Sequence, residues 1–353
     1  MDEYTTLQVI WFALIAVLWI GYFVLEGFDF GVGMLLPFLP RNERERDVMF
    51  ETIGPVWDGN EVWLVVAGGA TFAAFPAWYA SMFSGFYLAL LLVLVFLIVR
   101  VVSFEWREKG HSPRWRAVWT SANVVGSVGA SFLWGVALSN LVHGVPLDSD
   151  GGWAGSFADL FSAYTLFGGI AVVLLFAFHG ATFLTVRTTG ELCQRAGRAA
   201  RRLSIPAGLA AVAFLVWTVA VAVDKNDKDV FPPVVPCALG VVALVLALVF
   251  VHRRRSGLAF AATAFGAVLL VATLFTSLYP RVLVSSPGFE NSLTVDNASS
   301  SHYALTVMTV VALIVTPLIF IYQGWTYYVF RARLGGDEPV GPVELLAEPT
   351  EGS

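Results

Sequence analysis

Two carboxylic acids lie three residues apart at the start of an apolar segment. They are Asp58 and Glu61, and the apolar run that follows them continues to Phe75. Residues three apart share one face of a helix, and an ionisable residue inside a membrane-spanning helix costs roughly 2.5–3.5 kcal/mol on insertion scales. Such residues usually face a bundle interior, a partner subunit or a water path. The pair is therefore a candidate for proton transfer, unless the membrane begins only after Glu61.

A second pair with the same spacing, Glu26 and Asp29, lies in the preceding apolar segment. Facing lipid, all four acids would cost on the order of 10 kcal/mol. Two roles stay open: a path that carries protons from the cytoplasm, or a structural ion-pair network with Arg100 or with basic groups of a partner. Arg100 is also a candidate for holding the cluster together.

Three further residues could bind a cofactor. His179 is the only histidine well inside an apolar segment, and it could ligate a haem iron or serve as a hydrogen-bonded packing residue. Trp57 and Trp63 flank the acids; they fit an interfacial aromatic belt or a pocket for a flat quinone ring, and Trp57 is also a candidate for supporting the acidic cluster. No metal-binding or haem-attachment signature appears.

The composition identifies the class of protein that must position these residues. Of the 353 residues, 57% are hydrophobic and only 13% are charged, whereas a soluble domain has about 25% charged residues. A membrane span needs about 20 apolar residues. We predict an all-α integral membrane protein with nine spans, at about 8–36, 54–75, 82–103, 117–141, 163–186, 204–223, 232–251, 257–279 and 303–330.

The basic residues alternate between the connections. Eighteen of the 21 Lys and Arg residues lie around the connections after spans one, three, five and seven or after span nine, and the others are Lys225, Lys228 and Arg281. Because short cytoplasmic loops carry the excess of Lys and Arg, we predict an external N-terminus and a cytoplasmic C-terminus. Both acidic pairs then fall in the cytoplasmic half of the membrane.

The predicted spans form a single domain over residues 1–333. From their number we expect two four-helix bundles plus one peripheral helix. Residues 334–353 are acidic and rich in Pro and Gly, which predicts a disordered tail.

The motifs of the first two spans resemble subunit II of the cytochrome bd quinol oxidases, the subunit without haem. The resemblance runs from about residue 4 to 330, and its most specific part is Trp57-Asp58-Gly59-Asn60. Its other motifs are Glu26-Gly27-Phe28-Asp29-Phe30-Gly31-Val32-Gly33, Phe83-Ser84-Gly85-Phe86-Tyr87, Gly180-Ala181-Thr182, Arg187 to Leu192, and Ser285-Ser286 with Asn291 to Thr294.

The resemblance implies a heterodimer in a bacterial cytoplasmic membrane. A haem-bearing subunit I would hold two b-type haems and one d-type haem, oxidise quinol and reduce O2 to water, which generates a proton motive force. This chain would support that subunit and lend it a proton path, with Asp58 at the entrance and Asp29 and Glu61 beside it. The resemblance implies no haem ligand in this chain, and it leaves open a structural quinone, a small single-span accessory subunit, and ubiquinol or menaquinol as the donor.

Two other functions remain to be distinguished. A proton-coupled secondary transporter would also have midplane acids and glycine-interrupted helices, although no second copy of the Trp57–Asn60 motif is visible. A purely structural subunit would carry the same acids as an inert cluster. Nothing in the composition suggests a nucleic-acid partner.

Overall fold

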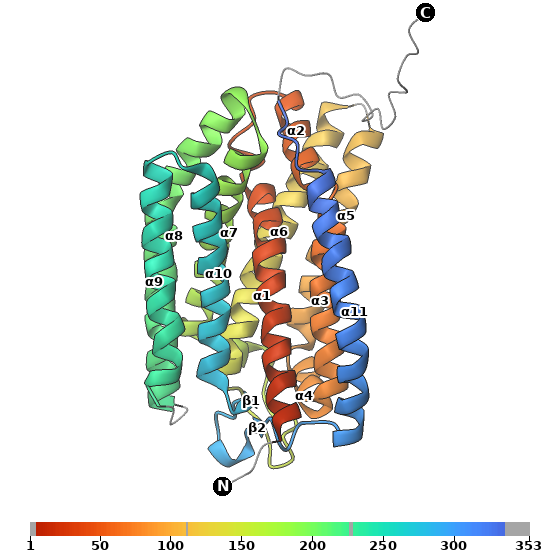
Figure 1. Ribbon diagram of the computed structural model, residues 1–353, viewed down its shortest axis with the longest axis vertical. Helices are drawn as coiled ribbons and strands as arrows, with labels where there is room; N and C mark the ends of the chain where they lie inside the picture. Colours follow the sequence, from red (N-terminus) through yellow and green to blue (C-terminus); the bar gives the residue numbers. More distant parts are fainter. Residues whose placement is uncertain (1–4, 111, 226–228, 336–353) are drawn as a thin grey trace, which may run out of the picture.

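The apolar segments form long helices that run side by side along one axis of the protein (Figure 1). The computed structural model describes residues 5–110, 112–225 and 229–335. Its α-helices are α1 (Thr6–Leu35), α2 (Glu43–Ile53), α3 (Trp57–Ala74), α4 (Pro76–Gly85), α5 (Tyr87–Lys109), α6 (Pro113–His143), α7 (Ala163–Arg187), α8 (Gly190–Lys225), α9 (Phe231–His252), α10 (Ser256–Leu278) and α11 (His302–Val329).

Eight of the described helices are long and apolar enough to cross a membrane: α1 and α5 to α11. The helix missing from this group is α3, which has 18 residues and carries both Asp58 and Glu61 in its first two turns. It nevertheless packs along α1. The all-helical membrane fold is therefore as predicted, whereas the ninth span stays a prediction.

The helices differ from the predicted spans in three places. The basic segment after the first span contains a helix, α2, which Asn42 caps by accepting a hydrogen bond from the Glu45 backbone N–H. The predicted third span begins within α4, a separate short helix that starts at Pro76. Helix α8 begins at Gly190 rather than at 204, because its polar first turns continue the helix beyond the apolar segment from which the span was predicted.

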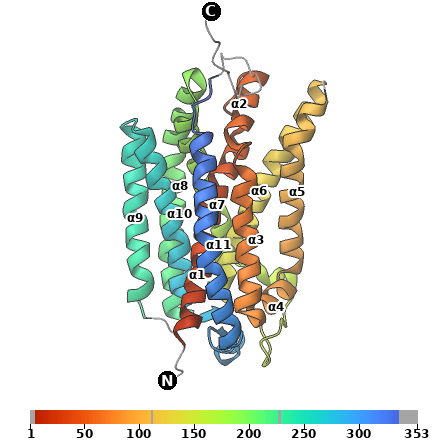
Figure 2. The same ribbon diagram turned by 45° about the vertical axis from the view of Figure 1, so that its right-hand side comes forward.

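Helices α1, α6, α7 and α10 contact one another at the centre of the molecule, while α9 and α5 lie towards opposite sides (Figures 1 and 2). Helix α1 approaches α7 closely at Gly31 and Gly180, where a Cβ atom added to Gly31 would lie 1.9 Å from the carbonyl oxygen of Phe176. Helix α11 lies outside this core, and only 6% of its apolar window is buried. This places one long apolar helix at the periphery of the described chain.

Short segments close the end at which α1 begins. Strands β1 (Arg281–Leu283) and β2 (Leu293–Thr294) form an antiparallel pair, and two 3-10 helices, η1 (Phe157–Leu160) and η2 (Phe289–Asn291), lie in the loops. At the opposite end, Leu334 pairs with Thr188. Most of the predicted tail, residues 336–353, lies outside the described residues.

Candidate functional site: a buried acidic cluster

Glu26 and Asp29 lie one turn apart on α1 and are completely buried. Arg100, which comes from α5 and is also completely buried, places its Nη1 atom 2.5 Å from Oε1 of Glu26. This is an ion pair without the angle of a hydrogen bond. Neither oxygen of Glu26 and none of the guanidinium nitrogens of Arg100 forms a hydrogen bond to another described residue. The pair therefore retains its capacity to donate and accept hydrogen bonds, which transfer of a proton through a buried site requires.

Aromatic rings surround the Arg100 guanidinium. Its Cζ atom lies 4.8 Å from the ring centroid of Phe30 and 5.6 Å from that of Phe104. Trp57 stacks on Phe104, with 5.6 Å between the ring centroids and 12° between the planes. Trp57 thus supports the acidic cluster indirectly, through the ring that packs against Arg100.

Asp29 has a different partner, Asn60 of α3. The Asn60 amide donates a hydrogen bond of 2.7 Å to Oδ2 of Asp29, and its own oxygen accepts one of 2.7 Å from the Tyr327 hydroxyl of α11. Gln323 also donates to Asn60, at 3.4 Å, and accepts from the indole N–H of Trp63, at 2.9 Å. A hydrogen-bonded chain thus runs from the buried carboxyl of Asp29 to the peripheral helix.

The acids of α3 are less buried than those of α1. Glu61 is half-buried and lies within electrostatic range of both Arg100 and Asp58. Asp58 is exposed on the surface of this chain. The four acids therefore form a series that runs from the surface at Asp58, through Glu61, to the buried Asp29 and Glu26.

His179 has both ring nitrogens engaged in hydrogen bonds. Nδ1 lies 2.7 Å from the hydroxyl of Thr263, and Nε2 lies 3.1 Å from the carbonyl oxygen of Val24. The ring is completely buried and stacks on Phe260, with the planes 4° apart. Because neither nitrogen is directed at an open position, this geometry fits the packing role and does not fit a haem ligand.

The sequence reasoning missed three residues of the site, Asn60, Gln323 and Tyr327. Asn60 adjoins Glu61 within the motif. A polar residue beside an acid in an apolar segment was therefore a signal, available in the sequence, that Asn60 belongs to the site. Gln323 and Tyr327 are about 260 residues further along the chain, and only the packing of α11 against α3 brings them to the cluster.

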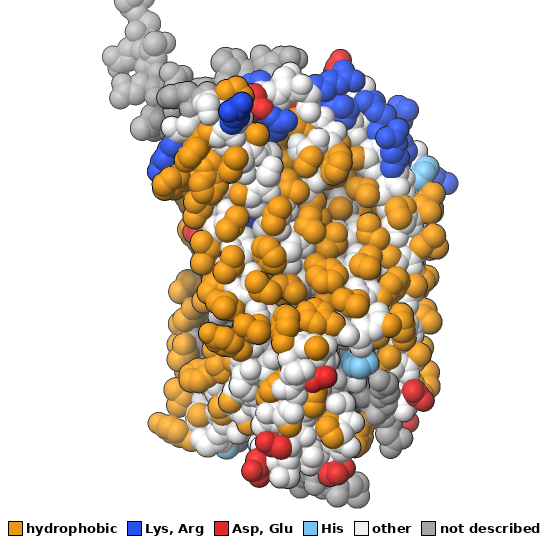
Figure 3. Space-filling view, turned by 180° about the vertical axis from the view of Figure 1, so that it is seen from behind, with side chains coloured by type: hydrophobic (Ala, Val, Ile, Leu, Met, Phe, Trp, Pro, Cys, Tyr) orange, Lys and Arg blue, Asp and Glu red, His pale blue; other side chains and the backbone are white. Residues whose placement is uncertain are grey.

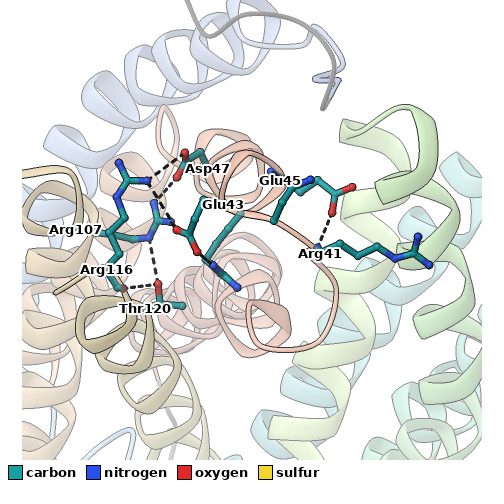
Figure 4. A network of polar contacts seen from close by, with 9 residues as sticks. Arg41, Glu43, Glu45, Asp47, Arg107, Arg116 and Thr120 are labelled. Carbon is teal, nitrogen blue, oxygen red and sulfur yellow. Dashed lines mark hydrogen bonds and ion pairs between the residues drawn. The ribbon is translucent and has the colours of Figure 1, made fainter. Parts of the chain in front are cut away.

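A network of ion pairs at the basic end was also missed (Figure 4). Arg107 of α5, which is 2% exposed, pairs with Glu43 and Asp47 of α2. On the other side of α2, Arg195 of α8 pairs with Glu45. Helix α2 is therefore held between α5 and α8.

A groove of about 530 Å³ opens between α3, α4 and α5, away from the acids. Its walls are almost entirely apolar and include the rings of Trp19, Trp78, Tyr79, Phe83 and Trp134. The indole N–H of Trp78 is buried without a hydrogen-bond partner among the described residues. Trp57 and Trp63, which the sequence offered as walls of a quinone pocket, do not line this groove.

Comparison with known proteins identifies the class of this membrane protein. The sequence model of the family described as cytochrome bd terminal oxidase subunit II matches residues 7–330. The chain is 43% identical over 340 residues to cytochrome bd ubiquinol oxidase subunit 2 of Bacillus subtilis. This alignment covers 95% of this chain and 99% of the relative. It is 36% identical over 367 residues to cytochrome bd-I ubiquinol oxidase subunit 2 of Escherichia coli K12, and this alignment covers 95% of this chain and 97% of the relative.

The fold agrees with these sequence relationships. A chain in the structure of the bd oxidase from Geobacillus thermodenitrificans superposes with a TM-score of 0.72 at 18% identity, over 92% of this chain and 99% of the other. This protein is thus a subunit of a membrane-bound oxidoreductase of the bacterial respiratory chain. The chain belongs to the cytochrome bd terminal oxidase subunit II family. That membership decides against the transporter alternative.

Proposed function

We propose that this chain supports a haem-bearing subunit I and supplies it with protons from the cytoplasm through Asp58, Glu61, Asp29 and Glu26. The observation that carries the proposal is the gradient in burial of the four acids, from exposed Asp58 to fully buried Glu26. Chains keep ionisable residues at such positions where they serve an ion or proton pathway. Arg100 places a positive charge beside the buried acids, which offsets part of the cost of ionising a carboxyl group there.

The proposed orientation puts the basic end of the molecule in the cytoplasm. Lys and Arg side chains gather over the end that contains α2, and acidic side chains are seen at the other end (Figure 3). This agrees with the positive-inside rule. We therefore propose nine spans, with α3 crossing as part of the α1–α3 pair, an external N-terminus and a cytoplasmic C-terminus. The arrangement as two four-helix bundles plus α11 belongs to the same proposal.

The partner surface is proposed to include α11 and α3. Helix α11 exposes large apolar side chains along its length, among them Leu313, Ile321 and Trp325. The hydrogen-bonded chain from Asp29 ends on the same helix at Tyr327. A partner docked there would cover the apolar face and lie beside the proton path.

The haems of the complex, two of b type and one of d type, are proposed to lie in subunit I, where they would carry the electrons from quinol to O2. His179, the candidate ligand of this chain, has no nitrogen free for iron. The part of this chain is then to bind the partner, to exclude water from the apolar outer half, and to hold protons at the four carboxyl groups. Whether a small single-span accessory subunit joins the complex stays an expectation.

A structural quinone would fit the groove between α3, α4 and α5. The groove is apolar and lined by aromatic rings. One lining residue, Trp78, has a buried indole N–H without a hydrogen-bond partner among the described residues, and we propose this N–H as the donor to a quinone carbonyl. Solvent extraction of the purified complex should then yield quinone bound in this chain, and Trp78→Phe should lower that yield. A yield that the substitution leaves unchanged would exclude the groove as the site.

The proton path is tested by Asp58→Asn in the assembled complex. We expect an unchanged haem spectrum with a several-fold loss of quinol oxidation and of membrane potential in proteoliposomes. The matched control is Glu191→Gln, which removes an exposed acid of α8 at the same end of the molecule. Undiminished oxidation and potential in a haem-loaded Asp58→Asn complex would leave only the structural role of the acids.

A further inference from the structure

A second hollow lies at the basic end, between the end of α1, helix α2 and the first turns of α6. Its volume is about 270 Å³. It is lined by Leu36, Pro37, Glu43, Arg46, Ala117, Thr120, Ser121, Val124 and Val125. None of these residues belongs to the acidic cluster or to the aromatic groove.

The lining changes character along α6. Helix α6 starts at Pro113, so Thr120 and Ser121 lie nearer the basic end, and Val124 and Val125 lie about one turn, or roughly 5.4 Å, further along. Val125 is 55% exposed. The hollow thus has hydroxyl groups at one level and an apolar wall beneath them, which matches a molecule with a polar head and an apolar tail.

Arginines outnumber carboxylates in the ion-pair network that includes Glu43 and Arg46 of the hollow. Three guanidinium groups, those of Arg46, Arg107 and Arg116, contact the single carboxylate of Glu43. Asp47 is shared by Arg107 and Arg116 (Figure 4). Three positive charges therefore meet two negative ones, which leaves an excess of one positive charge.

Of the three arginines, Arg46 is the one that lines the hollow, and one of its hydrogen-bond donors is unused. Its Nε atom is buried and has no hydrogen-bond partner among the described residues. Burial, followed by the nearby charge of Arg107, lowers the pKa of Arg46. One additional anion beside Arg46 would offset both effects.

We propose that this hollow binds the phosphate of an acidic phospholipid, with the phosphate between Arg46 and the hydroxyl group of Ser121. One acyl chain would lie along Val124 and Val125. A phosphodiester supplies the missing negative charge, and arginine binds phosphate through charge-assisted hydrogen bonds. Basic groups at a membrane surface attract acidic lipids in general, but the tail of a lipid is also needed to fill the apolar half of this hollow. The lipid would join the end of α1, the first turn of α2 and the first turns of α6 at the basic end of the molecule.

The test uses the complete complex, purified in detergent and exchanged into nanodiscs of phosphatidylcholine with limiting phosphatidylglycerol. Native mass spectrometry then counts the phosphatidylglycerol that the complex retains. Arg46→Gln removes the charge, and Ala117→Phe fills the hollow without changing any charge. We expect each variant to lose one retained phosphatidylglycerol per complex. Arg44→Gln is the matched control, because Arg44 lies on the same helix and pairs with Glu51 outside the hollow, and it should retain the wild-type number.

The wild-type complex provides a second measurement that depends on no substitution. One phosphatidylglycerol should survive detergent washing that removes phosphatidylcholine, and millimolar inorganic phosphate should not displace it. Displacement by inorganic phosphate would mean that the site binds free phosphate and would overturn the lipid assignment. Equal retention of the two lipids, or equal retention by the Arg46, Ala117 and Arg44 variants, would overturn the site.

Discussion

Glu26 of α1 and Arg100 of α5 form a completely buried ion pair. Oε1 and Nη1 lie 2.5 Å apart, and neither side chain exposes any surface. Removing one partner of a buried pair costs about 3–5 kcal/mol, because the other charge is left uncompensated, whereas replacing both is often close to neutral. The pair therefore couples the stability of the chain to the proposed proton path.

Replacing Arg100 by Met should destabilise the complex by about 3–5 kcal/mol. The double variant Arg100→Met with Glu26→Gln should recover most of that loss, since no charge then remains unpaired. The yield of haem-loaded complex and its thermal inactivation rate measure both effects. A double variant less stable than Arg100→Met would contradict this account of the pair.

Asn60→Leu should weaken the attachment of α11 to α3. It removes the donor to Asp29 and the acceptor of Tyr327, and each buried group left without a partner costs about 1–3 kcal/mol. Faster backbone hydrogen exchange in α11 is the expected readout. Tyr327→Phe is the milder comparison, because it removes one hydrogen bond, and equal exchange rates in the two variants would argue against Asn60 as the link.

Gly31→Ala should prevent the close approach of α1 and α7. The added Cβ would lie 1.9 Å from a backbone carbonyl oxygen, and overpacking a core costs about 1–3 kcal/mol or more. The amount of assembled complex in membranes should fall. Gly208→Ala on α8 meets nothing within 4 Å and should leave assembly unchanged, so a similar loss in both variants would indicate a general sensitivity to substitution.

Glu45 of α2 predicts a pH dependence of stability. Burial alone would raise the pKa of Glu45, but the backbone N–H of Arg41 and the guanidinium of Arg195 outweigh it and lower the pKa below its ordinary value. The stabilisation is therefore present above the unfolded-state pKa and is lost as the pH falls through the lower folded-state value. The difference in melting temperature between the wild type and Glu45→Gln should be largest at neutral pH and should disappear in acid. A difference that grows in acid would have the wrong sign.

The sequence alone was sufficient to predict the membrane class and the long helices, and it singled out Glu26 and Asp29, which are buried in the structure. Both predictions follow from the composition and from the length of the apolar runs. Charged residues are costly in lipid, so the spans are visible as long stretches with few charges. The same reasoning could not locate α2, because that segment is polar and its helix is stabilised by ion pairs to α5 and α8. It also could not decide whether α3 crosses the membrane, because two acids lower the hydrophobicity of this short helix.

Only the tertiary structure decided which partners the acids have. The sequence offered Arg100 as one of several partners for four acids; the packing of α5 beside α1 pairs it with Glu26. Asp29 instead reaches Tyr327 through Asn60, across nearly 300 residues of chain. Such pairings depend on the orientation of whole helices, which is set by close contacts such as that of Gly31 with Gly180. Local residue patterns indicate where the long apolar helices form, but they do not determine which helix lies beside which.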